Sequence, residues 1–129
     1  MPSKRSLVGR NNRPWASLPS AVVHEISVQQ LQAKLRAGEP VYLLDVRQGW
    51  EHDFAALPGS CLIPLDQLSL RAAEVQPPER SAVVVYCHHG IRSRTGAAIL
   101  QQRGLIEVFS LAGGIDAWSR LIDPQVPRY

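Results

Sequence analysis

The sequence predicts a single-domain α/β protein in which a central, mostly parallel five-stranded sheet is flanked by helices on both faces. Segments rich in Val, Ile and Leu alternate with segments of helical periodicity about five times within roughly 100 residues, the pattern of parallel strands joined by helices. The 129 residues are 45% hydrophobic, which is enough for one core. Ala82–Tyr86 is a continuous apolar run with β-branched residues at its centre, as expected of a strand buried on both faces.

Both ends of the chain are expected to lie outside the domain. Residues 1–20 are predicted to form an irregular basic leader, residues 21–122 the domain, and residues 123–129 an extended C-terminal tail. The first 23 residues hold four basic residues and no acidic one, whereas the rest holds ten basic and eleven acidic residues. The net charge of +3 therefore belongs to the leader. Pro14 and Pro19 interrupt it, which favours a solvated segment over a transit peptide or a nucleic-acid contact.

The first half of the domain predicts three strands, each followed by a helix. A strand over 22–26 precedes a helix that Ser27 caps, because Gln30 follows at the capping-box spacing. Apolar residues recur at helical intervals at positions 28, 31 and 35, and Gly38 ends the helix. The next elements are a strand over 41–46, a short helix over 48–56, a turn over 57–60, a strand over 61–63 and a helix over 65–75.

The second half carries the most informative turn. After a loop over 76–80, the strand Ala82–Tyr86 ends at Cys87, and a helix over 93–103 follows until Gly104 stops it. A strand over 107–111, the pair Gly113-Gly114 and a last helix over 115–121 complete the domain. A lone thiol is thus placed on a short turn between a buried strand and a helix N-terminus.

The position of Cys87 predicts a nucleophile. Ligands of open α/β sheets bind beyond the carboxyl ends of the strands, and helix N-termini and short turns present N–H groups that bind anions. These groups favour a thiolate, and positive charge nearby adds to the effect, from His88, His89, Arg92 and Arg94. The alternative is an inert cysteine that packs as a small hydrophobic residue. A nucleophile also requires a thiol that solvent can reach.

Four segments, in order along residues 24–122, resemble the rhodanese-like family. Asp45-Val46-Arg47 with Glu51 resembles its D-V-R-x-x-x-E, and Leu57 to Pro64 resembles its I-P-G-A-x-x-I-P. Cys87 to Ser93 resembles its C-x-x-G-x-R-S active loop, and Leu111 to Trp118 resembles its L-x-G-G-x-x-A-W ending. Ala55-Ala56 stand where many members have Gly-His before the second segment, a departure that does not touch the thiol.

The resemblance implies a small sulfurtransferase of the thiosulfate sulfurtransferase (rhodanese) type. It implies that Cys87 accepts sulfur from thiosulfate or a persulfide donor and passes it, through a persulfide, to cyanide, a thiol or a carrier protein. The amides of the active loop are then expected to hold the anionic sulfur, from His88, His89, Gly90, Ile91 and Arg92. No cofactor is expected.

Asp45, Arg47, Glu51 and Ser93 are expected to support the loop. For Arg47 and Glu51 a structural pair is favoured over direct catalysis, and Ser93 is expected to cap a helix or donate to the loop. Arg92 has two equal interpretations, attraction of an anionic donor and anchoring of the loop on a carboxylate. At least one of the adjacent histidines is expected to face solvent, and with no third ligand nearby they do not predict a zinc site.

Glycines and the second cysteine are given structural interpretations. Gly90 is expected to supply a positive φ or a close approach of the backbone, and Gly113-Gly114 a turn that lets the last helix pack. For Cys61, packing in a short buried strand is favoured over a role as a resolving thiol. Two cysteines are too few for a disulfide scaffold and suit a reducing, cytoplasmic setting.

Two other functions compete with sulfur transfer. Phosphatases of related fold carry a C-x5-R loop, one residue longer than the segment from Cys87 to Arg92, and a phosphoryl group needs more room than one sulfur atom. A non-catalytic interaction module typically lacks the cysteine that this chain keeps, whereas a sulfur relay to another protein stays open. No apolar run approaches the length of a membrane span, so no membrane partner is expected. No nucleic-acid partner is expected either, because the excess positive charge is confined to the leader.

Overall fold

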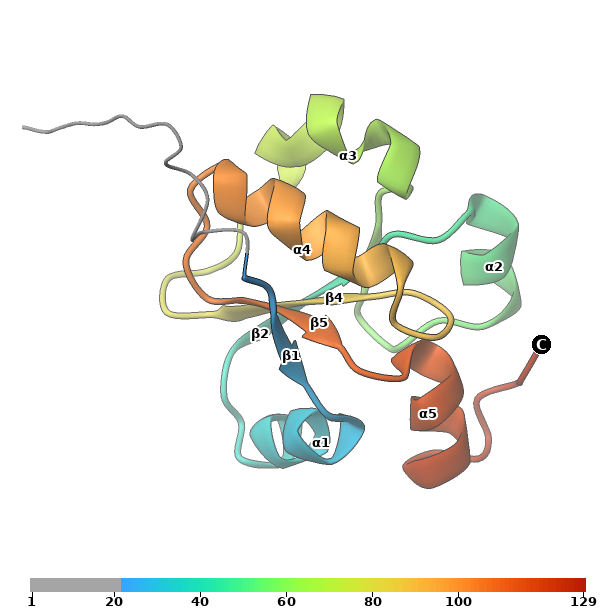
Figure 1. Cartoon of the computed structure of the whole chain (residues 1–129). Helices are drawn as coiled ribbons and strands as arrows, with labels where there is room; N and C mark the ends of the chain where they lie inside the picture. Colours follow the sequence, from blue (N-terminus) through green and yellow to red (C-terminus); the bar gives the residue numbers. More distant parts are fainter. Residues whose placement is uncertain (1–21) are drawn as a thin grey trace, which may run out of the picture.

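A five-stranded parallel sheet organises the molecule (Figure 1). The computed structural model describes residues 22–129, so the predicted leader over 1–20 lies outside the described residues. The strands stand in the order β1-β5-β4-β2-β3 and every pairing is parallel. Their bounds are β1 (His24–Ile26), β2 (Val41–Asp45), β3 (Cys61–Leu62), β4 (Ala82–Tyr86) and β5 (Val108–Leu111). The predicted α/β architecture is confirmed, and each strand ends within two residues of its expected bounds.

Helices cover both faces of the sheet. They are α1 (Val28–Arg36), α2 (Gly49–Phe54), α3 (Leu65–Arg71), the 3-10 turn η3 (Ala72–Glu74), α4 (Arg92–Gln102) and α5 (Gly114–Leu121). Figure 1 shows α3 and α4 on one face and α1 and α5 on the other. None of the helices within residues 22–129 is both long enough and apolar enough to cross a membrane.

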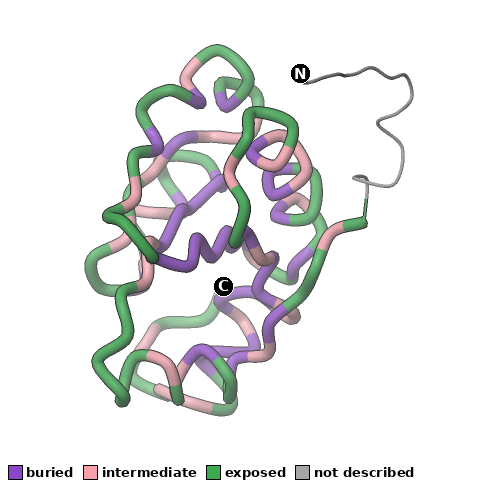
Figure 2. The backbone as a smooth tube through the Cα atoms, turned by 90° about the vertical axis from the view of Figure 1, so that its left-hand side faces the viewer, coloured by how far each residue is buried: buried purple, intermediate pink, exposed green. Residues whose placement is uncertain are grey.

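Strand β4 is buried on both faces, as its uninterrupted apolar sequence predicts. Val84 and Tyr86 pack in the apolar cluster beneath α1 and α5, whereas Val83 and Val85 pack in the cluster beneath α3 and α4. Cys87 continues the second row. Figure 2 shows the buried residues gathered along the sheet and on the inner sides of the helices.

The carboxyl ends of β2, β4 and β5 meet at one edge of the sheet. Asp45 is the Cα partner of Tyr86, and Val85 is the partner of Ser110. Because parallel strands all leave the sheet at the same edge, the chain segments that follow these three strands emerge side by side. This register brings together the segments beginning at 46, 87 and 112.

Local signals set most element boundaries. The predicted capping box is present, since Gln30 N donates to Ser27 Oγ at 3.0 Å and Ser27 N donates to Gln30 Oε1 at 2.9 Å. Leu35, expected on the apolar face of this helix, is exposed instead. The helix predicted over 65–75 breaks after Arg71 into the 3-10 turn.

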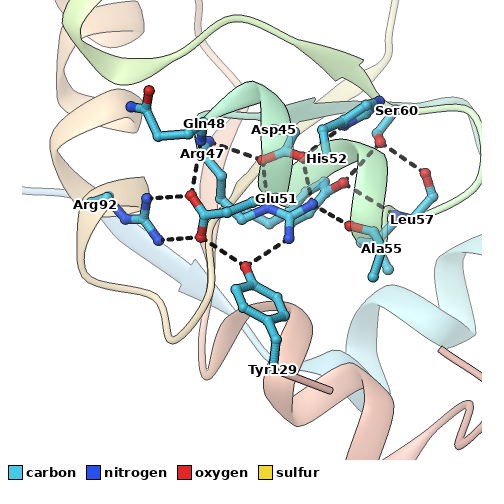
Figure 3. Close-up of polar contacts among 11 residues, drawn as sticks. Asp45, Arg47, Gln48, Glu51, His52, Ala55, Leu57, Ser60, Arg92 and Tyr129 are labelled. Carbon is cyan, nitrogen blue, oxygen red and sulfur yellow. Dashed lines mark hydrogen bonds and ion pairs between the residues drawn. The ribbon is translucent and has the colours of Figure 1, made fainter. Parts of the chain in front are cut away.

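The C-terminal segment, residues 123–129, differs from the extended tail that we expected. Val126 N donates to Asp123 O at 3.1 Å, and the Ser119 hydroxyl donates to Val126 O. Val126 and Tyr129 pack against the apolar cluster beneath α1 and α5. The segment thus folds back onto the domain and brings Tyr129 beside α2 (Figure 3).

Candidate active site

Cys87 lies where the sequence places it, directly after β4 and at the start of the loop that leads into α4. Its sulfur accepts hydrogen bonds from the backbone N–H groups of Gly90, at 3.2 Å, and Ser93, at 3.3 Å. Two N–H dipoles directed at one sulfur stabilise negative charge on it. The sulfur of Cys87 is therefore the point on which two backbone N–H groups of the loop converge.

The active loop, residues 87–92, is locked against the start of α5. Ile115 N donates to Cys87 O at 2.9 Å and Asp116 N donates to His88 O at 3.0 Å. A Cβ on Gly114 would lie 2.5 Å from the Cys87 carbonyl oxygen, so only glycine permits this approach. Gly90 has a φ of +99° and faces the Gly113 backbone in the same way. Gly113-Gly114 is therefore more than a turn, because it forms one wall of the loop.

Behind Cys87 lies a pair of buried hydroxyl groups. Ser93 Oγ is 3.6 Å from the Cys87 sulfur and 2.7 Å from Ser110 Oγ. Ser93 does not cap α4, whose N-cap is Ile91; its backbone N–H, and not its hydroxyl, donates to the Cys87 sulfur. Ser110 was missed by the sequence reasoning; its signal is a polar residue inside the apolar strand β5 beside β4.

Arg92 anchors the loop. Its two terminal nitrogens donate to the two carboxylate oxygens of Glu51, at 2.9 and 3.1 Å (Figure 3). Gln48 N donates to the same carboxylate at 2.9 Å. Burial alone raises the pKa of Glu51, but the bonds from Arg92, Gln48 and Tyr129 outweigh it and lower the pKa to about 2. Of the two interpretations of Arg92, the structure supports the anchor.

Arg47 pairs with Asp45, not with Glu51 as predicted. Its Nε and Nη2 donate to the two Asp45 oxygens at 2.8 and 2.7 Å, and its backbone N–H donates to Asp45 Oδ1 at 2.9 Å. Both side chains are fully buried, and His52 Nδ1 lies 2.8 Å from Asp45 Oδ2. The pair fixes the turn between β2 and α2 and so places Glu51 beneath Arg92.

Tyr129 completes this network from the far end of the described chain. Its hydroxyl accepts from Arg47 Nη1 at 2.7 Å and donates to Glu51 Oε2 at 2.8 Å (Figure 3). Its ring stacks on His88 with centroids 3.9 Å apart and planes at 8°. Nothing in the residues around 129 predicted this contact, because the partners are more than 40 residues away.

The adjacent histidines stack on each other, with ring centroids 4.0 Å apart. His89 is exposed, as expected for one of the two, whereas burial and the neighbouring His89 lower the pKa of His88. The structure brings a third potential ligand, Asp116, into their group, which the sequence reasoning did not foresee. The Asp116 carboxylate already accepts from Arg120 and Arg128, at 3.0 Å each, and two guanidinium charges oppose a cation there.

The solvent exposure of both cysteines differs from what we expected. Cys87 is 1% exposed, so in this conformation the thiol does not meet the requirement that solvent reach it. Cys61 was predicted to be buried but is exposed, because the two-residue strand β3 lies at the edge of the sheet. Ile91, at the tip of the active loop, is exposed.

Comparison with known proteins bears on what this loop does. A family model described as "Rhodanese-like domain" matches residues 27–121. The chain is 35% identical to a protein named "Sulfurtransferase" from Allochromatium vinosum, over 77% of this chain and 91% of that one. It is also 36% identical to the "Rhodanese-like/PpiC domain-containing protein 12, chloroplastic" of Arabidopsis thaliana, over 83% of this chain but only 38% of that protein.

Among solved structures, a "Rhodanese-like Domain Protein" from Staphylococcus aureus is similar in fold. It superposes with a TM-score of 0.69 at 25% identity and covers 83% of this chain and 99% of that one.

Proposed function

The chain belongs to the rhodanese-like family, and from this premise we propose that it is a sulfurtransferase that works through a persulfide on Cys87. The observation that carries the proposal is the pair of backbone N–H groups, from Gly90 and Ser93, that converge on the Cys87 sulfur. These donors stabilise a thiolate before the reaction and an anionic persulfide after the first transfer.

In the first half-reaction the Cys87 thiolate attacks the outer sulfur of thiosulfate. A new S–S bond forms on Cys87, the S–S bond of thiosulfate breaks, and its electron pair leaves with sulfite. Arg92 and Arg47 are both engaged with carboxylates, so the donor anion is held by loop amides rather than by a free guanidinium. A persulfide donor reacts in the same way and releases its thiolate.

In the second half-reaction a thiophile attacks the outer sulfur of the Cys87 persulfide. The electron pair of the persulfide bond returns to Cys87, and cyanide leaves as thiocyanate or a thiol as its own persulfide. A carrier protein with a terminal thiol is an equivalent acceptor. Both cysteines of the chain are free thiols, which suits work in a reducing compartment such as the cytoplasm.

The geometry argues against the phosphatase. Arg92 donates both terminal nitrogens to Glu51, so it does not offer its fork to a phosphate bound over Cys87. The segment from Cys87 to Arg92 is also one residue shorter than C-x5-R. The enzyme, the sulfur relay and the interaction module differ in which sulfur donor loads Cys87. The following experiment therefore distinguishes them by the donor that adds sulfur to the protein.

The test is intact mass after incubation with thiosulfate and removal of the excess. We expect a gain of one sulfur atom on the wild type and on Cys61→Ser, no gain on Cys87→Ser, and release of thiocyanate when cyanide is added. A gain on Cys87→Ser, or none on the wild type with any sulfane donor, contradicts the proposal. Loading by a persulfide but not by thiosulfate identifies a relay, and phosphate release from an aryl phosphate without sulfur loading identifies a phosphatase.

A further inference from the structure

Two serine side chains are buried behind the Cys87 sulfur, in a part of the sheet that is otherwise apolar. Ser93 and Ser110 are both 0% exposed. Side chains alternate along a strand, so Ser110 lies on the same face of β5 as Val108, which packs in the apolar cluster beneath α3 and α4. A hydroxyl buried in such a row destabilises the fold unless it is hydrogen-bonded, so the partner of Ser110 needs an explanation.

The partner of Ser110 leads to the reacting sulfur. Ser110 Oγ lies 2.7 Å from Ser93 Oγ, and Ser93 Oγ lies 3.6 Å from the Cys87 sulfur. Within residues 22–129, Ser93 Oγ is the only hydrogen-bond partner of the Ser110 hydroxyl. The three groups therefore form a hydrogen-bonded chain with two contacts, and Ser110 communicates with the sulfur through Ser93.

The direction of these hydrogen bonds depends on whether the sulfur carries a hydrogen. A Cys87 thiol donates to Ser93 Oγ, the Ser93 hydroxyl then donates to Ser110 Oγ, and the Ser110 hydrogen has no acceptor within the chain. When the sulfur carries no hydrogen, as in a persulfide, both bonds can reverse: Ser110 donates to Ser93 Oγ, and the Ser93 hydroxyl donates to the sulfur. Each hydroxyl hydrogen then has an acceptor, so this direction is the favoured one.

We propose that Ser110 is a positioning residue for sulfur transfer: it orients the Ser93 hydroxyl so that this hydroxyl donates to Cys87 Sγ when the persulfide is discharged. Because this role is a step of sulfur transfer, it rests on the proposed function. The acceptor attacks the outer sulfur, the S–S bond breaks, and its electron pair returns to Cys87 Sγ. A donor already directed at the atom where negative charge develops stabilises that transition state.

The two half-reactions use this hydroxyl differently. During discharge, negative charge builds up on Cys87 Sγ, and the Ser93 hydroxyl adds a third hydrogen bond to those from the N–H groups of Gly90 and Ser93. During loading, the same sulfur gives up negative charge as it attacks the donor, so a hydrogen bond to it does not assist that step. Loss of the Ser110 hydroxyl should therefore slow discharge and not loading.

The first experiment measures each half-reaction by itself, in a Cys61→Ser parent in which Cys87 is the only thiol. The protein is loaded with thiosulfate, freed of the excess and mixed with cyanide, and thiocyanate release is followed in a single turnover. We expect Ser93→Ala to slow release about tenfold, because a hydrogen bond to a charged atom is lost. Ser110→Ala should slow release about threefold, because it removes only the strengthening of that bond by its neighbour. Loading by thiosulfate should keep its rate in both variants.

The double variant separates positioning from packing. If Ser110 acts through Ser93, Ser110→Ala slows release when the Ser93 hydroxyl is present and has no further effect in Ser93→Ala. A merely structural serine slows release by the same factor in both backgrounds. Ser110→Thr and Ser110→Val form a matched pair of nearly equal shape, so any strain from the larger side chain is common to both. The threonine, which keeps the hydroxyl, should release thiocyanate faster than the valine.

Ser81→Ala is the control for the loss of a buried hydroxyl. Ser81 is buried just before β4, at the opposite end of the strand from Cys87, and its Oγ has no hydrogen-bond partner in the described part of the chain. Ser81→Ala should leave both half-reactions unchanged, and circular dichroism should show that every variant keeps the fold.

Three results overturn the role of Ser110 while the proposed function stands. They are equal release in Ser110→Ala and its parent, a loss that persists in Ser93→Ala, and equal release in Ser110→Thr and Ser110→Val. Slowing of loading by the same factor as release also overturns it, because that is the effect of a distorted loop. A parent protein that takes up no sulfur refutes the proposed function and the role of Ser110 together, so the two failures are distinguishable.

Discussion

Substituting Gly114 by alanine tests the claim that the active loop and α5 form one packed unit. Gly114 has a φ of +60°, and an added Cβ would lie 2.5 Å from the Cys87 carbonyl oxygen. Gly38, which ends α1, has a φ of +74° but nothing within 4 Å of the same added atom. Gly38→Ala therefore measures the backbone strain alone, and the difference between the two variants measures the collision.

The expected magnitudes follow from these contacts. Left-handed backbone strain costs an alanine about 1–2 kcal/mol at either position. At Gly114 the loop carbonyls must also retreat by about 1 Å to reach ordinary van der Waals distance. That retreat weakens the bonds from Ile115 N to Cys87 O and from Asp116 N to His88 O, each worth about 1 kcal/mol net. We therefore expect a total loss of about 3–4 kcal/mol for Gly114→Ala.

Urea unfolding followed by circular dichroism measures the free energy of unfolding of both variants. Thiosulfate–cyanide sulfur transfer measures the activity of the protein that is folded. Because a displacement of about 1 Å moves the carbonyls that flank Cys87, we expect Gly114→Ala to lose about 100-fold in sulfur transfer while Gly38→Ala keeps its rate. Equal destabilisation of the two variants, or unchanged kinetics in Gly114→Ala, refutes the argument that these glycines shape the loop.

Two further predictions concern the carboxylates. The pKa of Glu51 falls from an ordinary value of 4.5 to about 2 on folding, so its contribution is complete above 4.5 and is lost as the pH falls towards 2. The free energy of unfolding should therefore drop by about 3 kcal/mol over this window on account of Glu51, and Glu51→Gln should flatten the profile measured by urea titration at several pH values. A parallel profile in Glu51→Gln contradicts the assignment. Arg47→Met should destabilise the protein by about 3–5 kcal/mol in the same assay, because it leaves the buried Asp45 carboxylate without its cation. A loss below about 1 kcal/mol means that His52 alone satisfies Asp45.

Features set by neighbouring residues were predictable from the sequence. The run Ala82–Tyr86 dictates a strand buried on both faces whatever surrounds it, and Ser27 with Gln30 fixes the start of α1. The loop after β4 was predictable for the same reason. The end of a buried strand and the start of a helix lie so close in the sequence that Cys87 has to lie on the turn between them. The family motifs added the expectation that Glu51 and Gly114 belong to the same site.

Features set by the tertiary fold were not predictable. Arg47 has acidic residues two positions before it and four after it, and only the turn between β2 and α2 decides that Asp45 takes the pair. Ser110 reaches Ser93 through the pairing of β5 with β4, and Tyr129 reaches Arg47 across 82 positions. The burial of Cys87 was missed because it depends on the covering residues, whereas the sequence shows only the thiol and its loop.

The exposure of Cys61 on an edge strand has a practical consequence for anyone handling the protein. In air-exposed solution, oxidation begins at the accessible sulfur, so a covalent dimer bridged through residue 61 accumulates while the buried thiol stays intact. Before that oxidation, titration of thiols with a chromogenic disulfide counts mostly the exposed Cys61 and little of Cys87. Storage under reductant, or a serine at that position, removes the artefact before any assay begins.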